Sequence, residues 1–307
     1  MKKLKVDIKI DLKHTVARQK QIEELRNNQV ILDYLNRNNL PTSFIEENVG
    51  ILEDYLLTYA ICQNCKGLEH CKYAERGAYK DTLVENSIVS FAIKKCDFLL
   101  EREKRFAHLN MYQVNHLREE FHDVSIFSIN VENESADYLK ICNDIITWLD
   151  KDSKKGVYFY GGFGVGKTYL AACISNELAK NGKSIAFINS SEFCNEMRLN
   201  WNNAEFLQQT ISKMKNLDLL VIDDIGSEVV TNWVRDELLF PILDGRMGNR
   251  KLTLFTSNYN YEELLKHFVF NNKGEKDELN ATRFMERIQS LSTLVTVKAK
   301  NRRLKEV

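Results

Sequence analysis

The sequence has few of the features that mark exported, membrane-spanning or low-complexity proteins. Its 307 residues include only two prolines, Pro41 and Pro241, and no internal repeat or compositionally biased segment is present. No apolar run approaches the roughly 18 residues that a membrane-spanning helix requires. Residues 1–14 alternate apolar and charged side chains and lack the apolar stretch of a secretory signal. We therefore expect a soluble, cytoplasmic protein.

The sequence also has no net charge, since 43 basic residues face 43 acidic ones. A chain without an overall positive field has no general attraction to nucleic acid, so any such binding must use a local groove. At roughly 100–200 residues per domain, the length allows two domains with at least one sizeable core.

Cysteine is the first informative residue type, because four of the seven cysteines cluster. In a chain without an export signal, clustered cysteines more often hold metal than form disulfides. Four thiolates at these spacings suit tetrahedral zinc, and with no catalytic partner nearby the metal is expected to fold a small module. Unrelated free thiols and a redox C-x-x-C pair are the alternatives. The predicted zinc ligands are Cys62, Cys65, Cys71 and Cys96.

The residues around this cluster favour helices. Residues 14–38 carry apolar side chains close to a 3.6-residue period, and residues 44–59 read as a second helical stretch. Residues 93–122 are rich in Lys, Arg and Glu and suggest a helical connector. We predict a small, mainly helical, zinc-binding domain over residues 1–105, followed by a helical linker over residues 106–122.

The pattern changes in the second half of the chain, which we assign to one domain over residues 123–307. Short apolar runs with β-branched or aromatic residues alternate there with longer amphipathic segments. This alternation predicts an α/β fold, with a parallel sheet that has helices on both faces and binds ligands at the carboxyl ends of its strands. The expected strands are 156–160, 184–189, 217–222 and 252–256, and the expected helices are 168–180, 232–245 and 261–268.

A phosphate-binding loop follows the first of these strands. Residues 161–168, GGFGVGKT, satisfy G-x-x-x-x-G-K-[ST] between a strand and a helix, which is the P-loop context. Its glycines let backbone N–H groups surround the β- and γ-phosphates at the positive end of a helix. We expect Lys167 to reach these phosphates and the Thr168 hydroxyl to ligate Mg²⁺. The residues predicted to bind ATP are Gly161, Gly162, Phe163, Gly164, Val165, Gly166, Lys167, Thr168, Tyr169 and Asp223.

Two acids follow another predicted strand. Asp223 and Asp224 come directly after the apolar run 219–222, so a buried strand would deliver both carboxylates to its carboxyl end. Asp223 is expected to hold Mg²⁺, and Asp224 to orient or deprotonate the attacking water, slowly because Asp reaches less far than Glu. Asn258 follows a third strand and is a candidate to place its amide between the γ-phosphate and Asp224. A solvated acidic turn and a simple asparagine turn are the alternatives.

Basic residues suggest two further sites. Arg283 and Arg287 lie four residues apart, on one face of a predicted helix. Either could act as an arginine finger in a neighbouring subunit, so that hydrolysis requires assembly; a solvated basic face is the alternative. Residues 192–206 mix an arginine with aromatic residues and suit either base stacking on single-stranded DNA or a packed amphipathic helix.

Together these motifs resemble those of the bacterial replicative helicase loaders, the DnaC/DnaI-type branch of the AAA+ ATPases. The resemblance rests on the P-loop, on LLVIDDIG at 219–226 and on TLFTSN at 253–258, behind a cysteine-bearing N-terminal module. It extends through residues 229–247 and 281–293 and so covers essentially the whole chain. A second Asp in the acidic pair is typical of the helicase loaders and of the related transposition helpers.

The resemblance implies an ATP-dependent loader that places the DnaB-type helicase on single-stranded DNA during primosome assembly and replication initiation. In that case the zinc domain binds the helicase hexamer, the ATPase domain binds ATP and single-stranded DNA, and the loader self-associates on the helicase beside other primosome proteins. By the family motif, Arg287 is preferred over Arg283 as the finger, and residues 300–303 lie where relatives carry a sensor-like arginine. The alternative is a transposition helper ATPase that binds DNA and recruits a transposase.

Overall fold

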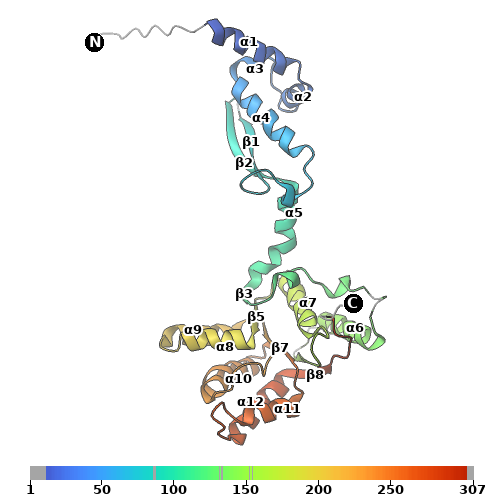
Figure 1. Cartoon of the computed structure of the whole chain (residues 1–307), viewed down its shortest axis with the longest axis vertical. Helices are drawn as coiled ribbons and strands as arrows, with labels where there is room; N and C mark the ends of the chain where they lie inside the picture. The colour runs from blue at the N-terminus through green and yellow to red at the C-terminus, as the bar shows by residue number, and fades with distance from the viewer. Residues whose placement is uncertain are drawn as a thin grey trace, which may run out of the picture. The chain divides into compact units, whose positions relative to one another are not determined.

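The computed structural model describes residues 12–85, 88–130, 132, 134–151, 153 and 155–302. The chain divides into two compact units, Met1–Lys104 and Arg105–Val307, which are described separately below (Figure 1). Within the described residues, no helix is both long and apolar enough to cross a bilayer.

Four helices form the core of the first unit. They bury Ile31, Ile45 and Leu52 completely, and Asn28 interrupts what the apolar period predicted as one helix over 14–38. The Asn28 side chain accepts hydrogen bonds from the backbone N–H groups of Val30 and Ile31, so it caps a new helix. The four helices are α1 (Leu12–Arg26), α2 (Gln29–Arg37), α3 (Phe44–Glu47) and α4 (Val49–Cys62).

A two-stranded hairpin follows these helices and was not predicted. β1 (Ala78–Glu85) pairs antiparallel with β2 (Ile88–Lys95), and α5 (Asp97–Phe106) comes next. The hydroxyls of Tyr34 and Thr82 lie 2.7 Å apart and are hydrogen-bonded, which ties the hairpin to α2. The prediction of a helical connector beginning at residue 93 is therefore wrong for its first residues, because β-branched and aromatic side chains in β2 favour the extended backbone.

A six-stranded parallel sheet organises the second unit. Its strand order is β3-β5-β6-β7-β4-β8, and every described pairing is parallel. The predicted parallel sheet is thus confirmed, and the four expected strands correspond to the four central ones. The strands are β3 (Tyr112–Asn115), β4 (Gly156–Tyr160), β5 (Ile185–Asn189), β6 (Leu219–Asp223), β7 (Leu252–Ser257) and β8 (Ser292–Thr296).

The two edge strands were missed. β3 lies within the segment predicted as a helical linker over 106–122, which otherwise consists of short 3₁₀ turns. β3 has only four residues, and alternate ones face the core, so its apolar signal is weak. The prediction of a helical linker is wrong, because this segment completes one edge of the sheet.

Helices cover both faces of the sheet, as predicted (Figure 1). Side chains alternate along each strand: Val157 and Phe159 face the core beneath α6 and α7, whereas Tyr158 faces the core beneath α8 to α12. The segment predicted as one helix over 232–245 is a π-helix, η6, that continues into α10, where Pro241 occupies the first turn. The helices are α6 (Ala136–Asp150), α7 (Lys167–Lys180), α8 (Ser190–Leu199), α9 (Ala204–Asn216), η6 (Trp233–Leu239), α10 (Phe240–Gly248), α11 (Tyr261–Val269) and α12 (Glu278–Leu291).

Candidate nucleotide site

The predicted P-loop connects the end of β4 to the start of α7. Gly164 and Gly166 adopt φ angles of +73° and +98°, which residues with a side chain rarely do. A Cβ atom on Gly164 would lie 1.9 Å from the side-chain oxygen of Asn301, and one on Gly166 would lie 3.1 Å from the Tyr138 hydroxyl. The positive φ angles therefore favour glycine at both positions, and the loop presents the amino end of α7 to a ligand.

The Lys167 ammonium lies inside this loop. Its Nζ donates hydrogen bonds to the carbonyl oxygens of Gly161 (2.9 Å) and Gly162 (2.8 Å) and to Oδ1 of Asn258 (2.7 Å). Lys167 is only 6% exposed, so its charge acts in a poorly solvated place where phosphate oxygens are strong acceptors. Asn258, which follows β7, thereby lies beside the P-loop lysine.

Oxygen ligands suited to a divalent cation meet at the end of β6. Oδ1 of Asp223 accepts hydrogen bonds from the hydroxyls of Thr168 (2.9 Å) and Thr256 (2.6 Å). Burial, reinforced by the charge of Asp224, raises the pKa of Asp223 to about 6 despite these two bonds. Carboxylate and hydroxyl oxygens are hard ligands of the kind that Mg²⁺ prefers, so Thr168 and Asp223 fit the metal predicted for them.

Asp224 is held beside Asp223 in an unusual backbone conformation. Its φ angle is +55°, and its backbone N–H donates to the Thr256 hydroxyl at 2.9 Å. Asp224 is half-buried and lines the same cavity as the P-loop. The structure therefore brings a second carboxyl into the wall of the P-loop cavity, directly after Asp223.

These groups line one cavity of about 470 Å³, which is within the usual size range of small-molecule sites. Phe163, Tyr169 and residues 164–168 between them form one part of its wall, whereas Gly161 and Gly162 are not among its lining residues. Another part comes from the segment that was predicted as a linker, and the rings of Phe121 and Tyr169 meet edge to face at 6.3 Å. Sequence reasoning missed the lining residues His116, Leu117, Arg118, Glu120 and Phe121, because assigning the segment to a linker removed it from the site.

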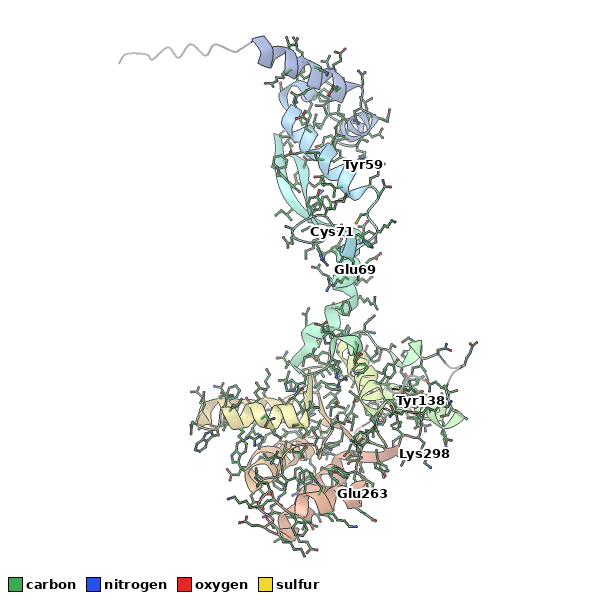
Figure 2. All side chains as sticks on the ribbon, viewed as in Figure 1. Tyr59, Glu69, Cys71, Tyr138, Glu263 and Lys298 are labelled. Carbon is green, nitrogen blue, oxygen red and sulfur yellow. The ribbon has the colours of Figure 1, made fainter. Side chains whose placement is uncertain are left out.

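The end of the described chain returns to the P-loop. The Arg302 backbone N–H donates to the Gly164 carbonyl at 3.0 Å, and its guanidinium pairs with Glu134 at 2.7 Å. The same guanidinium lies 4.3 Å from the ring centre of Tyr138, a residue of α6 that is labelled in Figure 2. Within the predicted basic stretch 300–303, Arg302 thus lines the nucleotide cavity.

Comparison with known proteins agrees with this site. Residues 80–307 match the family described as IstB-like ATP binding protein, which is more than half of the chain. This chain belongs to the IstB-like ATP-binding proteins. The family name accounts for the P-loop and shows that the unit built around it binds ATP.

Individual relatives of this IstB-like protein are named for helicase loading. It is 27% identical to the replicative helicase loader DnaI of Bacillus subtilis (strain 168) over 293 residues, which cover 93% of this chain and 94% of the relative. It is 34% identical to the replicative helicase loader DnaC of Escherichia coli (strain K12) over 109 residues, or 35% of this chain and 44% of DnaC. A crystal structure of DnaI superimposes with a TM-score of 0.53 and 29% identity, covering 64% of this chain and 98% of that structure. The predicted resemblance to helicase loaders is confirmed.

The two candidate finger arginines of this IstB-like protein lie outside its own nucleotide cavity. Both guanidinium groups lie 5.3 Å from the ring centre of Phe240, and Arg287 also donates to Asp244 at 2.8 Å. Arg283 is exposed, and the Arg287 side chain is 22% exposed. Neither is among the residues that line the described P-loop cavity, so neither completes the site in its own chain.

The four clustered cysteines line a separate cavity of about 240 Å³ in the first unit. Cys71, labelled in Figure 2, accepts a hydrogen bond from the Gly77 N–H at 3.3 Å. Burial, together with the neighbouring thiols of the other three cysteines, raises the pKa of Cys62. Among the described residues, no three His, Cys, Asp or Glu side chains are arranged closely enough to hold a metal ion. The structure thus brings the predicted ligands together without arranging them as a metal site.

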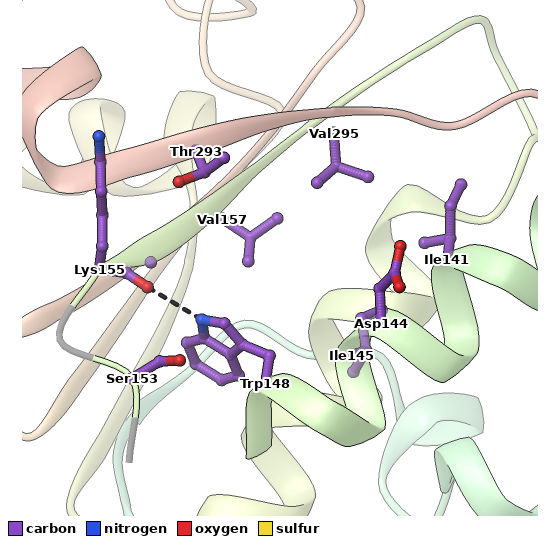
Figure 3. A pocket seen from close by; sticks show the side chains of 10 residues that line it. Ile141, Asp144, Ile145, Trp148, Ser153, Lys155, Val157, Thr293 and Val295 are labelled. Carbon is purple, nitrogen blue, oxygen red and sulfur yellow. Dashed lines mark hydrogen bonds between the residues drawn. The ribbon is translucent and has the colours of Figure 1, made fainter. Parts of the chain in front are cut away.

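A third cavity, of about 390 Å³, lies at the amino end of β4 (Figure 3). Its wall is formed mainly by apolar side chains of α6, β4 and β8, and the Trp148 indole N–H donates to the Lys155 carbonyl at 2.9 Å. None of the predicted nucleotide or metal residues lines it.

Proposed function

We propose that this protein is an ATP-regulated loader of a replicative helicase. The observation that supports this is the extent of the similarity to the B. subtilis helicase loader, which spans 93% of the chain. The similarity reaches beyond the ATP-binding match at residues 80–307 into the N-terminal unit. A transposition helper shares the ATPase fold but is not expected to carry the N-terminal cysteine module.

We propose that the P-loop unit hydrolyses ATP. Lys167 neutralises charge on the β- and γ-phosphates, and the backbone at the start of α7 binds them. Bound Mg²⁺ would be held by Thr168 and Asp223 and would supply charge stabilisation. Asp224 orients the attacking water. Asn258, which accepts a hydrogen bond from Lys167, places its amide between the terminal phosphate and Asp224. Because the Asp224 side chain reaches less far than a glutamate would, we expect a low rate of ATP hydrolysis.

We further propose that hydrolysis requires a second copy of the chain. Arg287 is fixed by Asp244 and Phe240 on a surface away from its own cavity, as an arginine acting on a neighbouring site must be. Arg283, against the same ring, is the second candidate. Such an arrangement links ATP turnover to self-association on the helicase.

The N-terminal unit is the proposed attachment to a DnaB-type helicase hexamer, and the ATPase unit is the proposed contact with single-stranded DNA. The direct test is size-exclusion chromatography with light scattering of the chain mixed with its cognate helicase, with and without ATP. A complex of defined ratio is expected, and Lys167→Ala should remove its ATP dependence by removing ATP binding. If no complex forms in either condition, helicase loading is wrong, and duplex DNA binding would then test the transposition-helper alternative.

We propose zinc for the cysteine cavity, with Cys62, Cys65, Cys71 and Cys96 as ligands. Four thiols lining one cavity, one of them already bonded to a backbone N–H, form a suitable soft donor set. Metal analysis of purified protein should find about one zinc ion per chain, lost when Cys62 and Cys65 are both changed to Ser. Changing the buried Cys142 and Cys194 to Ser is the matched control and should leave the zinc content unchanged. Zinc-free native protein with full helicase binding would contradict this assignment.

A further inference from the structure

Glu228 carries a buried carboxyl that does not line the nucleotide cavity; within the described residues, it forms no hydrogen bond with the P-loop or with the proposed metal ligands. Glu228 is 3% exposed, and its Oε2 accepts hydrogen bonds from the Ser190 hydroxyl (2.6 Å) and the Gly226 backbone N–H (3.0 Å). Within the described part of the chain, its Oε1 has no hydrogen-bond partner. Burying an incompletely bonded carboxyl costs free energy, so its retention calls for a function.

One of these bonds fixes the loop that carries Asp224. Gly226 lies two residues after Asp224, and the backbone N–H of Ser227 returns to the Asp224 carbonyl at 3.0 Å. Both Asp224 and Gly226 have positive φ angles, +55° and +95°. A loop in this conformation persists only where surrounding contacts hold it, and Glu228 supplies one of them from inside the core.

The other bond reaches the first residue of α8. Ser190 is fully buried, and the residue before it, Asn189, caps α8 by accepting a hydrogen bond from the Glu192 N–H at 3.2 Å. Asn189 and Glu192 both line the nucleotide cavity. The other end of α8 carries exposed apolar side chains: its last residue, Leu199, is 86% exposed, and Trp201, in the turn that follows, is 66% exposed.

We infer that Glu228 is a positioning residue for Asp224. Its carboxyl joins the Asp224 loop to the start of α8, so that a shift of α8 moves the second acid relative to a bound nucleotide. The inference rests on the proposed ATP hydrolysis, and it adds a route by which contacts made at the outer end of α8 change the rate of that reaction.

The kinetic test compares Glu228→Ala, Glu228→Gln and Ser190→Ala in the full chain. Glu228→Ala and Ser190→Ala should lower kcat by about 10-fold or more, because small misplacements of reacting groups are costly. The affinity for ATP should stay within about twofold, since the P-loop is untouched. Glu228→Gln should keep most of the activity, because an amide oxygen can accept both hydrogen bonds. Two variants are the matched controls. Glu205→Gln changes an exposed glutamate on α9 and matches Glu228→Gln, and Ser191→Ala changes the serine next to Ser190 and matches Ser190→Ala.

A second readout does not depend on hydrolysis. Backbone hydrogen exchange should become faster at residues 224–228 in Ser190→Ala, although the change is made on α8, and should stay unchanged in Ser191→Ala. Unchanged exchange in that loop, or an equal loss of ATP affinity and kcat in Glu228→Ala, would overturn the inference. If the unmodified protein hydrolyses no ATP, the proposed function fails, whereas the exchange result still decides the role of Glu228. If Glu228→Ala does not fold, Ser190→Ala alone decides it.

Discussion

At the scale of single residues, Asp223 is an acid in a position where burial disfavours its ionised form. It is 7% exposed, and the neighbouring Asp224 adds a second negative charge. At the other end of β6, Asp218 shows the opposite behaviour: hydrogen bonds from Ser184 and Lys251 outweigh partial burial and lower its pKa to about 2. The ionised acid at the amino end of this strand therefore stabilises the fold, whereas the ionised acid at its carboxyl end destabilises it.

We predict that Asp223→Asn stabilises the protein in the absence of nucleotide. With a folded pKa of about 6 against roughly 3.9 in an unfolded chain, Asp223 lowers the free energy of unfolding as pH rises from about 4 to about 6. Above that range the cost is constant, at about 3 kcal/mol, because each pKa unit corresponds to about 1.4 kcal/mol. Urea unfolding at pH 7.5 should therefore show Asp223→Asn to be more stable than the unmodified protein, while Mg²⁺-dependent ATP binding is lost.

The control is Asp218→Asn, for which the sign reverses. A lowered pKa contributes stability that is present above about pH 4 and is lost as pH falls toward 2, so this substitution should destabilise at pH 7.5. All three tryptophans, Trp148, Trp201 and Trp233, lie in the second unit, so their fluorescence follows that unit alone. Equal stability of both variants at pH 7.5 would contradict the prediction.

The residues of the site could be predicted from the sequence because each motif is short and local. The glycines, Lys167 and Thr168 lie on one loop, and Asp223 and Asp224 follow one strand. His116 and Phe121 could not be found in this way, because they join the cavity only through a four-residue edge strand with little apolar signal. Glu228 could not be predicted either, since a lone Glu in a turn normally faces solvent.

At the scale of helices and strands, a buried arginine joins three elements of the second unit. Arg246 on α10 donates to the Met214 and Leu217 carbonyls at the end of α9, and to Leu252 and Thr253 on β7. It is fully buried, and burial lowers its pKa to about 9. Its bonds replace the partners that these carbonyl groups would otherwise find in water.

We predict that Arg246→Ala lowers the free energy of unfolding of the second unit by about 3 kcal/mol or more, because several buried acceptors lose their donor. Urea unfolding followed by tryptophan fluorescence measures this. The control is Lys266→Ala on the exposed face of α11, which should change stability by less than about 0.5 kcal/mol. If Arg246→Ala behaved like this control, the carbonyl groups would have to find other partners.

Element prediction succeeded where the pattern was long or strongly apolar and failed where it was short or mixed. The four central strands are buried on both faces and read as continuous apolar runs, so they were found. β8 was missed because only Ser292 of its five residues is buried. In the first unit, the helices were predicted but the break between two of them at Asn28 was not. A single capping side chain determines where the second helix begins, and the apolar period carries no signal for it.

At the scale of the whole molecule, the boundary between the two units predicts which truncated chains fold and bind ATP. The second unit begins at Arg105, ahead of β3, and not after a linker that ends at residue 122. A chain of residues 105–307 should fold, bind ATP with unchanged affinity and fail to co-elute with the helicase. A chain of residues 117–307 lacks β3 and His116 and should lose ATP affinity as well. Full helicase binding by residues 105–307 would rule out the N-terminal unit as the attachment.

The order of strands in the sheet has a consequence for biosynthesis. β4, which leads into the P-loop, pairs with β7 and β8 and with no earlier strand among those described, so Tyr158 meets Phe255 on one side and Leu294 on the other. A ribosome therefore makes the phosphate loop long before it makes the two strands that support it. Contacts so distant in sequence form slowly, and the unsupported edges of β4 are open to wrong pairing in the meantime. Synthesis of the nucleotide site thus begins about midway through translation, at residues 161–168 of 307, and ends near the end of the described chain, at Arg302.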